Sequence, residues 1–318
     1  MSAPHGPVGV LLVNLGSPSE PTPKAVRAFL DEFLSDTRVV DMNPLLWRAL
    51  RRLVILPRRS PKVAKLYESI WMSEGSPLMV YSKRQAALLA TTLGPSHRVV
   101  LAMRYGQPSI ANGLAQLSGC REILVLPLFP QYSRTTTGTI EAAVSDELAA
   151  FHPRPTVRGI ADFHVHPAYI DALVERVEES LEAGPVDHYV FTFHGLPVRY
   201  VEKGDPYRIQ CEATAEALAV ALELPKERWS LVYQSRFGRE PWLQPYADKF
   251  VPLLADTKPR ILVVAPGFVS DCLETLEELG KRLAESFHAA GGKELRMVPC
   301  LNDHPAAIEM LAALVRGE

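Results

Sequence analysis

Two stretches of the chain place residues that can move protons or bind metal directly after apolar runs. In the first, FTFHGLP at 191–197, His194 ends an apolar run, and the Gly-Leu-Pro that follows stops helix and strand alike. In the second, APGFVSDCLETLEELG at 265–280, the run breaks at Pro-Gly and an acidic helix begins. A histidine titrates near neutral pH, and a row of carboxylates offers oxygen ligands for a divalent cation. Together they predict proton transfer coupled to metal handling.

The acidic residues of the second stretch have helical spacing. Asp271, Glu274 and Glu278 are three and four residues apart, so they form one stripe on a helix. Structural roles stay open beside the chemical one. Asp271 and Glu274 have the pattern of a capping box, and Glu278 with Arg282 has the spacing of an ion pair. His194 taken alone is more often a hydrogen-bonded core histidine than a catalyst.

Eight short apolar or β-branched runs are typical of strands that are buried on both faces of a parallel sheet. Helical patterns lie between them, at 81–93, 168–183, 210–224 and 271–290. This alternation predicts βαβ units and an α/β fold. The strands divide into two sets of four near residue 155, so we expect two doubly wound domains. The predicted strands are 8–14, 98–103, 122–129, 156–163, 188–194, 230–235, 260–266 and 296–301.

Composition excludes several classes of protein. The net charge of −2 over 318 residues gives no electrostatic basis for binding nucleic acid. The apolar runs are far shorter than a membrane span, and the first residues lack a signal-peptide pattern, so we expect a cytoplasmic protein. Four scattered cysteines with no CxxC pair indicate neither a zinc site nor a disulfide framework.

The signatures of the commonest α/β chemistries do not occur in the sequence. It contains no GxGxxG after a strand, no GxxxxGK[ST] and no GxSxG, which argues against dinucleotide, nucleotide and serine-hydrolase chemistry. Ligands of open parallel sheets bind at the carboxyl ends of the strands. His194 and Glu274 both follow predicted strands, so their side chains can reach one cleft.

Eight motifs, in order over nearly the whole chain, resemble those of the ferrochelatases, the enzymes that insert ferrous iron into a porphyrin. The resemblance implies two Rossmann-like domains, 1–155 and 156–302, with a porphyrin cleft between them, and a C-terminal helix at 303–318 that packs back on the first domain. The motifs are LLVNLGSP (11–18), EGSPLMVYSKRQ (74–85), MRYGQPSI (103–110), PLFPQYS (127–133), FHGLP (193–197), YQSRFGREPWLQPY (233–246), PGFVSDCLETLEELG (266–280) and LND (301–303).

The resemblance assigns roles to particular residues. It implies that His194 is the metal-insertion histidine, that Glu274 is the carboxylate facing it across the macrocycle, and that Glu278 is a further, weaker contact for the metal. Packing is an equal explanation for Phe268 and Trp242 and the favoured one for Tyr67. The porphyrin pocket would comprise Leu15, Arg104, Tyr105, Trp242, Phe268 and Asp271, and Tyr67, Ser76 and Tyr132 lie in matching segments.

Three departures from the family pattern limit what carries over. Cys272 stands where some relatives have a histidine, and Arg282 stands where many have a third acid, so an iron path along the helix is expected only as far as Glu278. No cysteine-bearing tail follows AALVRGE at 312–318. We therefore expect no iron–sulfur cluster and no tightly bound cofactor, with Fe²⁺ as a substrate.

The expected reaction is insertion of Fe²⁺ into protoporphyrin IX to give protohaem and two protons, in haem biosynthesis, by a monomeric lyase. Leu15 is an apolar contact where relatives that use coproporphyrin often have a tyrosine, which favours protoporphyrin. The alternatives are a coproporphyrin ferrochelatase, a cobalt or nickel chelatase, and a porphyrin or haem carrier that has no need of His194 and the acidic stripe.

One further segment, WRALRRLVILPRRS at 47–60, combines apolar residues with five arginines. It is expected to be a short amphipathic element with a solvated basic edge, or a cleft lip that meets porphyrin propionates. Of these, the lip is favoured. Contact with anionic lipid is expected to be weak.

Overall fold

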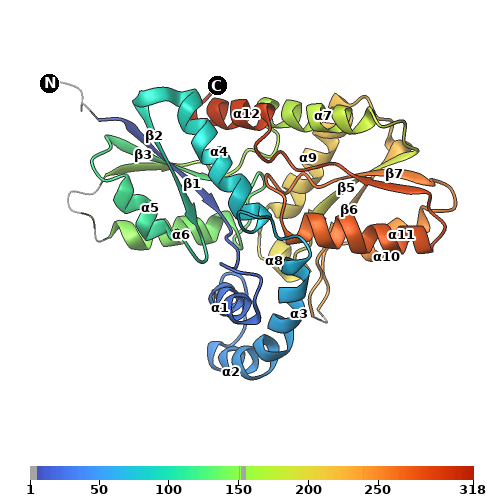
Figure 1. The fold of residues 1–318 in the computed structure, drawn as a ribbon, viewed down its shortest axis with the longest axis horizontal. Coiled ribbons are helices and arrows are strands. Elements are labelled where there is room, and N and C mark those ends of the chain that lie inside the picture. The colour runs from blue at the N-terminus through green and yellow to red at the C-terminus, as the bar shows by residue number, and fades with distance from the viewer. Residues whose placement is uncertain (1–5, 150, 152–154, 239) are drawn as a thin grey trace. The chain divides into compact units, whose positions relative to one another are not determined.

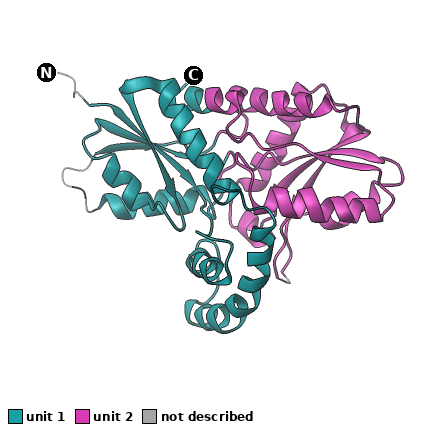
Figure 2. Cartoon of the chain, in the orientation of Figure 1, with its two compact units in different colours: residues 1–129, 133–162, 311–318 teal, residues 130–132, 163–310 magenta. Residues whose placement is uncertain are grey.

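The computed structural model describes residues 6–149, 151, 155–238 and 240–318, which form two compact units (Figures 1 and 2). Unit 1 comprises residues up to 129 together with 133–162 and 311–318, and unit 2 comprises 130–132 and 163–310. Each unit has its own parallel sheet of four strands. The prediction of an α/β fold with two four-stranded sheets is confirmed. No helix in the described part of the chain has the length and apolar character needed to cross a membrane.

The sheet of unit 1 has the strand order β2-β1-β3-β4, with every neighbouring pair parallel. All seven residues of β1 are buried, because this central strand is covered on both faces. Leu11 and Val13 of β1 belong to a core cluster that also contains Ile140 and Val144. The strands are β1 (Val8–Asn14), β2 (His97–Met103), β3 (Glu122–Pro127) and β4 (Thr156–Gly159).

The helices of unit 1 begin with recognisable caps. The helix expected at 81–93 starts four residues earlier, at Pro77, because the Ser76 hydroxyl accepts from the backbone N–H of Met79 and proline suits the first helical position. Figure 1 shows α1, α2 and α3 beyond the carboxyl ends of the strands of this unit. The helices are α1 (Pro23–Phe33), α2 (Pro44–Leu50), η1 (Arg51–Ile55), α3 (Leu56–Glu68), α4 (Pro77–Leu93), η2 (Gly94–Ser96), α5 (Ile110–Gln116), α6 (Thr137–Leu148) and α12 (Pro305–Arg316), of which residues from 311 belong to this unit.

The sheet of unit 2 has the strand order β6-β5-β7-β8 and is also parallel throughout. The strand expected at 296–301 lies at Glu294–Met297 instead. It pairs early because Glu294 is aligned with Arg260 of β7, and it ends before Pro299, which lacks the N–H that a ladder needs. The strands are β5 (His188–His194), β6 (Trp229–Gln234), β7 (Arg260–Val264) and β8 (Glu294–Met297).

The helix expected at 271–290 is divided into two. Glu274–Leu283 forms η4, a π-helix with i→i+5 hydrogen bonds, and Ala284–Ala289 continues as α11. π-Helical turns are rare and are frequent at functional sites. Leu279, Leu283 and Phe287 from these helices pack into the core of unit 2. The other helices are α7 (Pro167–Leu181), α8 (Val198–Glu202), α9 (Tyr207–Ala221), η3 (Lys226–Arg228) and α10 (Ala247–Leu253).

Candidate active site

His194 is the last residue of β5, and its ring has a defined tautomer. The ring Nδ1 lies 2.7 Å from the carbonyl oxygen of Gly195. A carbonyl can only accept, so Nδ1 carries the hydrogen and donates it. In the neutral imidazole, Nε2 therefore presents a lone pair. The half-buried side chain is held so that Nε2 can act as a proton acceptor.

Gly195 lets the chain pass close to β6 and Trp242. A Cβ at this position would lie 2.9 Å from the carbonyl oxygen of Gln234 and 3.2 Å from the Trp242 ring, so a larger residue would displace one of them. The Gly195 N–H donates to that same carbonyl at 2.7 Å. The Trp242 indole is 9% exposed, and its ring centroid lies 6.5 Å from that of His194. Trp242 thus packs beside the candidate base.

Gln234, at the end of β6, connects the histidine strand to the acidic helix. Its amide oxygen accepts from the Thr192 hydroxyl at 2.8 Å, and its amide nitrogen lies 3.5 Å from the carbonyl oxygen of Glu274. Glu274 is the first residue of η4 and is half-buried. The fold therefore brings His194 and Glu274 to the same edge of one sheet, at the carboxyl ends of its strands.

The Glu278 carboxylate is already engaged in the structure. One of its oxygens accepts from the Ser235 backbone N–H at 2.8 Å, and the other accepts from the Ser235 hydroxyl at 2.5 Å. Ser235 has φ of 64°, a backbone conformation that L-residues rarely adopt. Glu278 therefore holds the turn after β6 in place.

The capping box expected at Asp271 and the ion pair expected between Glu278 and Arg282 are both absent from the described part of the chain. Arg282 pairs with the buried carboxylate of Glu277, at 2.8 and 2.9 Å, rather than with Glu278. Asp271 is not an N-cap: its Oδ1 accepts from the Thr275 hydroxyl at 2.8 Å, and its Oδ2 accepts from a side-chain amide. Glu277 and Arg282 are five residues apart, a spacing that the wider turns of the π-helix bring together, whereas Asp271 lies before this helix, which begins at Glu274.

The three cysteine thiols of unit 2 are buried and reduced. Burial raises the pKa values of Cys211, Cys272 and Cys300 well above the ordinary value of a thiol. The nearby carboxylates of Glu274 and Asp271 act in the same direction on Cys272 and Cys300, respectively. As free thiols these groups stay protonated, which makes them poor nucleophiles.

In unit 1 the structure brings together Leu15, Arg104 and Tyr105. The backbone N–H of Tyr105 donates to the Leu15 carbonyl at 2.9 Å, and that of Arg104 donates to the Asn14 carbonyl at 2.8 Å. Gly16 permits this approach. It has φ of 108°, and a Cβ there would lie 1.9 Å from the Tyr105 carbonyl oxygen. The segments after β1 and β2 thus bring together the predicted porphyrin-pocket residues Leu15 and Arg104, with the Tyr105 side chain buried beside them.

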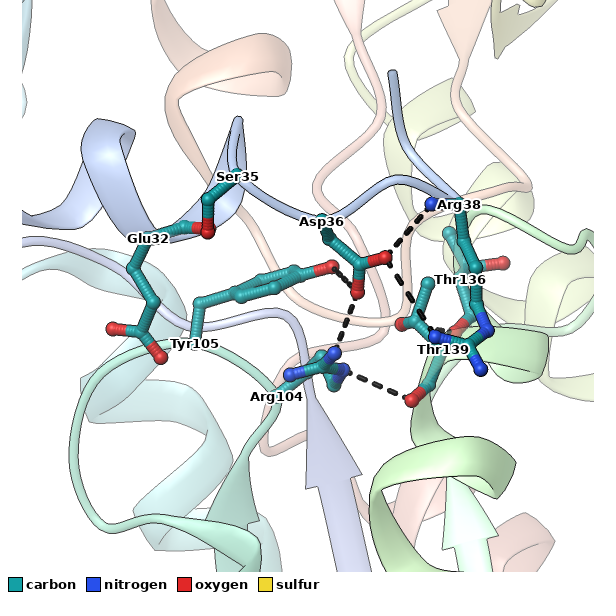
Figure 3. A network of polar contacts seen from close by, with 8 residues as sticks. All are labelled: Glu32, Ser35, Asp36, Arg38, Arg104, Tyr105, Thr136 and Thr139. Atoms are coloured by element: carbon teal, nitrogen blue, oxygen red, sulfur yellow. Dashed lines mark hydrogen bonds and ion pairs between the residues drawn. The ribbon is translucent and has the colours of Figure 1, made fainter. Parts of the chain in front are cut away.

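Asp36, which the sequence did not single out, joins Arg104 to Tyr105 (Figure 3). Its Oδ2 lies 2.5 Å from Arg104 Nη2 and accepts from the Tyr105 hydroxyl at 3.1 Å. Arg104 Nε donates to the Thr139 carbonyl at 3.0 Å. Burial raises the pKa of the Tyr105 phenol well above its ordinary value, so the hydroxyl stays a donor. The guanidinium of Arg104 is therefore held in place by an ion pair with Asp36 and a hydrogen bond to the Thr139 carbonyl.

This network opens on a cavity of about 290 Å³ within unit 1. The residues that line it are polar: Glu32, Ser35, Asp36, Thr37, Arg38, Arg104 and Tyr105. Glu32 accepts from the Gly106 N–H at 3.0 Å, so an acid holds each side of the Arg104–Tyr105 turn. Neither Glu32 nor Asp36 has a sequence signal, because both act on residues about seventy positions away.

The basic segment at 47–60 is divided between core and surface. Arg51 is buried and pairs with Asp31 at 2.8 Å, and Trp47 is buried with its indole N–H donating to the Leu34 carbonyl. By contrast, Leu45, Leu46 and Leu53 are 80%, 64% and 76% exposed. The exposed arginines are Arg48, Arg52, Arg58 and Arg59. The basic edge, for which five arginines were expected, therefore has four exposed arginines, because Arg51 is buried.

The remaining predicted residues are placed as follows. Tyr67 is buried with its ring edge-on to Trp71, in agreement with packing. Ser76 caps α4 and bonds the Ser17 hydroxyl, and the Tyr132 backbone N–H donates to Gln210. Phe268 is half-buried against the core of unit 2.

Two parallel α/β units of this kind define the chelatase class of fold. The solved structure of SirB from Bacillus subtilis with Fe³⁺ aligns over 98% of this chain and 94% of its own, with a TM-score of 0.58 at 13% identity. That of CbiX, the terminal enzyme for biosynthesis of siroheme in denitrifying bacteria, aligns over 97% and 98% with a TM-score of 0.53 at 14% identity.

The chain belongs to the ferrochelatase family, whose profile matches residues 7–318. The ferrochelatases of Vibrio vulnificus and Photobacterium profundum are each 50% identical to it over 311 residues, covering 96% of this chain and 97% and 96% of their own. That of Yersinia pestis is 48% identical over 312 residues, which is 97% of each chain. The resemblance seen in the motifs is confirmed.

Proposed function

We propose that this chain inserts Fe²⁺ into protoporphyrin IX, giving protohaem and releasing two protons, as a metal-inserting lyase of haem biosynthesis. The observation that carries the proposal is His194, whose Nδ1–H is committed to a carbonyl and whose Nε2 is left as an acceptor, at the sheet edge that also bears Glu274. A carrier would need neither a base nor this carboxylate.

His194 accepts pyrrole protons in this proposal. Free porphyrin carries two N–H protons that must leave as the metal–nitrogen bonds form. A neutral imidazole can take such a proton at Nε2 and pass it to water. A positioned base of this kind contributes about 10²- to 10⁴-fold in rate.

Glu274 handles the metal. Aqueous Fe²⁺ must lose water before it enters the ring, and a carboxylate oxygen can replace that water stepwise. The Glu274 side chain is half-buried and lies at the start of η4. Glu278, whose oxygens both accept from Ser235, is proposed to support the neighbouring turn and to contact metal only secondarily.

Porphyrin binding is assigned to Leu15, Arg104 and Tyr105 of unit 1 and to Trp242 and Phe268 of unit 2. Binding that bends the flat ring exposes nitrogen lone pairs on one face, so contacts to the periphery are converted into strain at the reacting centre. The Asp36 network supports this role because it fixes the Arg104–Tyr105 turn in advance.

Protoporphyrin IX is proposed as the preferred substrate over coproporphyrin. The two extra propionates of coproporphyrin would cost several kcal/mol if buried without donors against the Leu15 side chain. The guanidinium of Arg104, which follows the strand beside the Leu15 segment, is already paired with Asp36. The kcat/KM values of the two porphyrins with Fe²⁺ test this preference, and a higher value for coproporphyrin would refute it.

The catalytic assignments are tested with His194→Ala and Glu274→Gln. Each should lower the rate of metal insertion by at least about 100-fold while porphyrin still binds, as followed by fluorescence titration. Glu285→Gln, at an exposed acid in α11, is the matched control and should keep the wild-type rate. Near-normal turnover in either test variant would remove that residue from the mechanism.

Several finer points are part of the same proposal. We propose that the protein is a cytoplasmic monomer without an iron–sulfur cluster. The scattered positions of the four cysteines, with no CxxC pair, support the absence of a cluster. The division of the chain into domains at residues 155 and 302 stays a prediction.

Weak peripheral contact with anionic lipid is proposed for the segment 47–60, together with the leucines that directly precede it. Exposed leucines at 45, 46 and 53 lie beside four exposed arginines, a composition that suits the interface of an anionic bilayer. Flotation with phosphatidylglycerol vesicles should recover more protein than flotation with phosphatidylcholine vesicles. A Leu45→Ser/Leu53→Ser variant should reduce this recovery, and equal recovery from both lipids would refute the contact.

A further inference from the structure

Asn302, five residues after β8, is in an unusual backbone conformation in the interior of unit 2. It is 7% exposed and has φ of 49°, in the left-handed region that asparagine tolerates better than most residues. Its backbone N–H donates to the Val269 carbonyl at 2.8 Å. Its strained conformation is thus held in place beside the segment that leads from β7 to η4.

The Asn302 side chain forms two hydrogen bonds with Asp271. Its Oδ1 accepts from the Asp271 backbone N–H at 2.8 Å, and its Nδ2 donates to the Asp271 carboxylate at 2.6 Å. Only a side chain with both an acceptor and a donor can make this pair of bonds. With the bond to Val269, three hydrogen bonds from one residue fix residues 269–271.

Asp271 in turn is hydrogen-bonded to a residue in the first turn of η4. Its second oxygen accepts from the Thr275 hydroxyl at 2.8 Å, and the same hydroxyl accepts from the Cys272 N–H at 3.0 Å. Glu274 lies within this set of contacts, whose members Asp271, Cys272 and Thr275 are all buried. Both carboxylate oxygens of Asp271 are occupied by protein donors, so Asp271 acts through its neighbours rather than on the metal.

We propose that Asn302 is a positioning residue for metal insertion: through its two-point contact with Asp271 it holds Glu274 in the orientation that receives Fe²⁺. This inference rests on the proposed function of Glu274. It explains why asparagine occupies a strained position, since glycine would fit the backbone without making either bond and aspartate would set two carboxylates against each other.

Two single variants separate the side-chain contacts from the backbone. Asn302→Gly keeps the left-handed conformation and removes both bonds to Asp271. It should lower kcat about 10- to 100-fold, with the KM for porphyrin changed less than about threefold. Asn302→Asp should be at least as impaired. Glu223→Gly, at an exposed residue with φ of 53°, is the matched control and should keep the wild-type kcat.

An exchange of the two residues separates position from charge. In Asp271→Asn/Asn302→Asp, the amide at 271 donates to the carboxylate at 302, the backbone N–H of 271 still has an acceptor, and the Thr275 hydroxyl still has one too. The exchange variant should recover kcat to within about threefold of wild type, above Asp271→Asn or Asn302→Asp alone. An exchange no better than the single variants would show that the charge at 271, and not its position, is needed, and would overturn the proposal.

Hydrogen–deuterium exchange gives a readout independent of activity. Peptides covering 269–278 should exchange faster in Asn302→Gly and regain protection in the exchange variant, with the rest of the chain unchanged. Wild-type kcat in Asn302→Gly, with only a lower midpoint of thermal unfolding, would reduce Asn302 to a structural role. An inactive wild-type enzyme would refute the proposed function instead, and unchanged protection in Asn302→Gly would still refute the positioning contact.

Discussion

His188, at the start of β5, should make the protein lose stability in mild acid. The residue is 4% exposed, and its Nε2 lies 2.9 Å from the Ser230 hydroxyl. Burial, with smaller contributions from Lys258 and Arg228, lowers the pKa of this histidine from an ordinary 6.5 to about 4. The folded protein therefore holds His188 neutral over a range in which the unfolded chain protonates it.

The sign and size follow from proton linkage. Above pH 6.5, His188 is neutral in both states and has no effect on the pH dependence. As the pH falls from 6.5 to 4, the unfolded state takes up a proton that the folded state refuses, so the free energy of unfolding decreases, and below pH 4 this loss levels off. A difference of 2.5 pKa units, at 1.36 kcal/mol each, amounts to about 3 kcal/mol, of which about 2 are lost by pH 5.

Urea titrations of wild type and His188→Gln at pH 7.5, 6.5, 5.5 and 5.0, followed by tryptophan fluorescence, measure this effect. The variant keeps a group that can bond Ser230 but cannot titrate. It should be less stable than wild type at pH 7.5, and the gap should narrow by about 2 kcal/mol by pH 5.0. His288→Gln, at an exposed histidine of α11, is the control and should leave the pH dependence unchanged. A gap that stays constant would refute the assignment of a depressed pKa to His188.

Three other outcomes are expected. Asp36→Asn should lower the free energy of unfolding by about 2 kcal/mol in urea titrations, because it leaves the Arg104 guanidinium unpaired; a loss below about 0.5 kcal/mol would contradict this. Gly16→Ala should cost about 3 kcal/mol or more, whereas Gly184→Ala, at a positive φ with open space around it, should cost only about 1 in the same titrations. Protein treated with a chelator should regain full activity on addition of Fe²⁺ alone; iron–sulfur absorbance in freshly purified protein would contradict this.

The strands could be predicted because their signal is local. Runs such as VGVLLVN and HYVFTFH are buried along almost their whole length, and such burial needs consecutive apolar residues. β8 was misplaced because Glu294 and Arg296 pair with a neighbouring strand and with distant carbonyls, which no local pattern reveals. α1, α2 and α3 were not among the predicted helices, although α1 and α3 are amphipathic; only a short amphipathic element at 47–60 was expected in this region.

The site was predictable where a residue follows a strand and was not where a partner is distant. His194, Leu15 and Arg104 lie at or just after strand ends, and Glu274 begins the helix that follows β7, as their motifs indicated. By contrast, Asp36 and Asn302 act on residues 68 and 31 positions away. The π-helix also escaped prediction, since its side-chain spacing resembles that of an α-helix over a few residues. As a result, the predicted ion pair of Arg282 with Glu278 was wrong, and Arg282 pairs with Glu277.

Anaerobic incubation of the purified chain with Fe²⁺ and protoporphyrin IX is the most direct test of metal insertion. We predict that the absorption bands of the free porphyrin disappear and those of protohaem appear over many turnovers per protein molecule, and that His194→Ala abolishes this conversion while still binding porphyrin. Stoichiometric binding of porphyrin by the wild-type protein, with no metal inserted, would contradict the enzyme and identify a carrier.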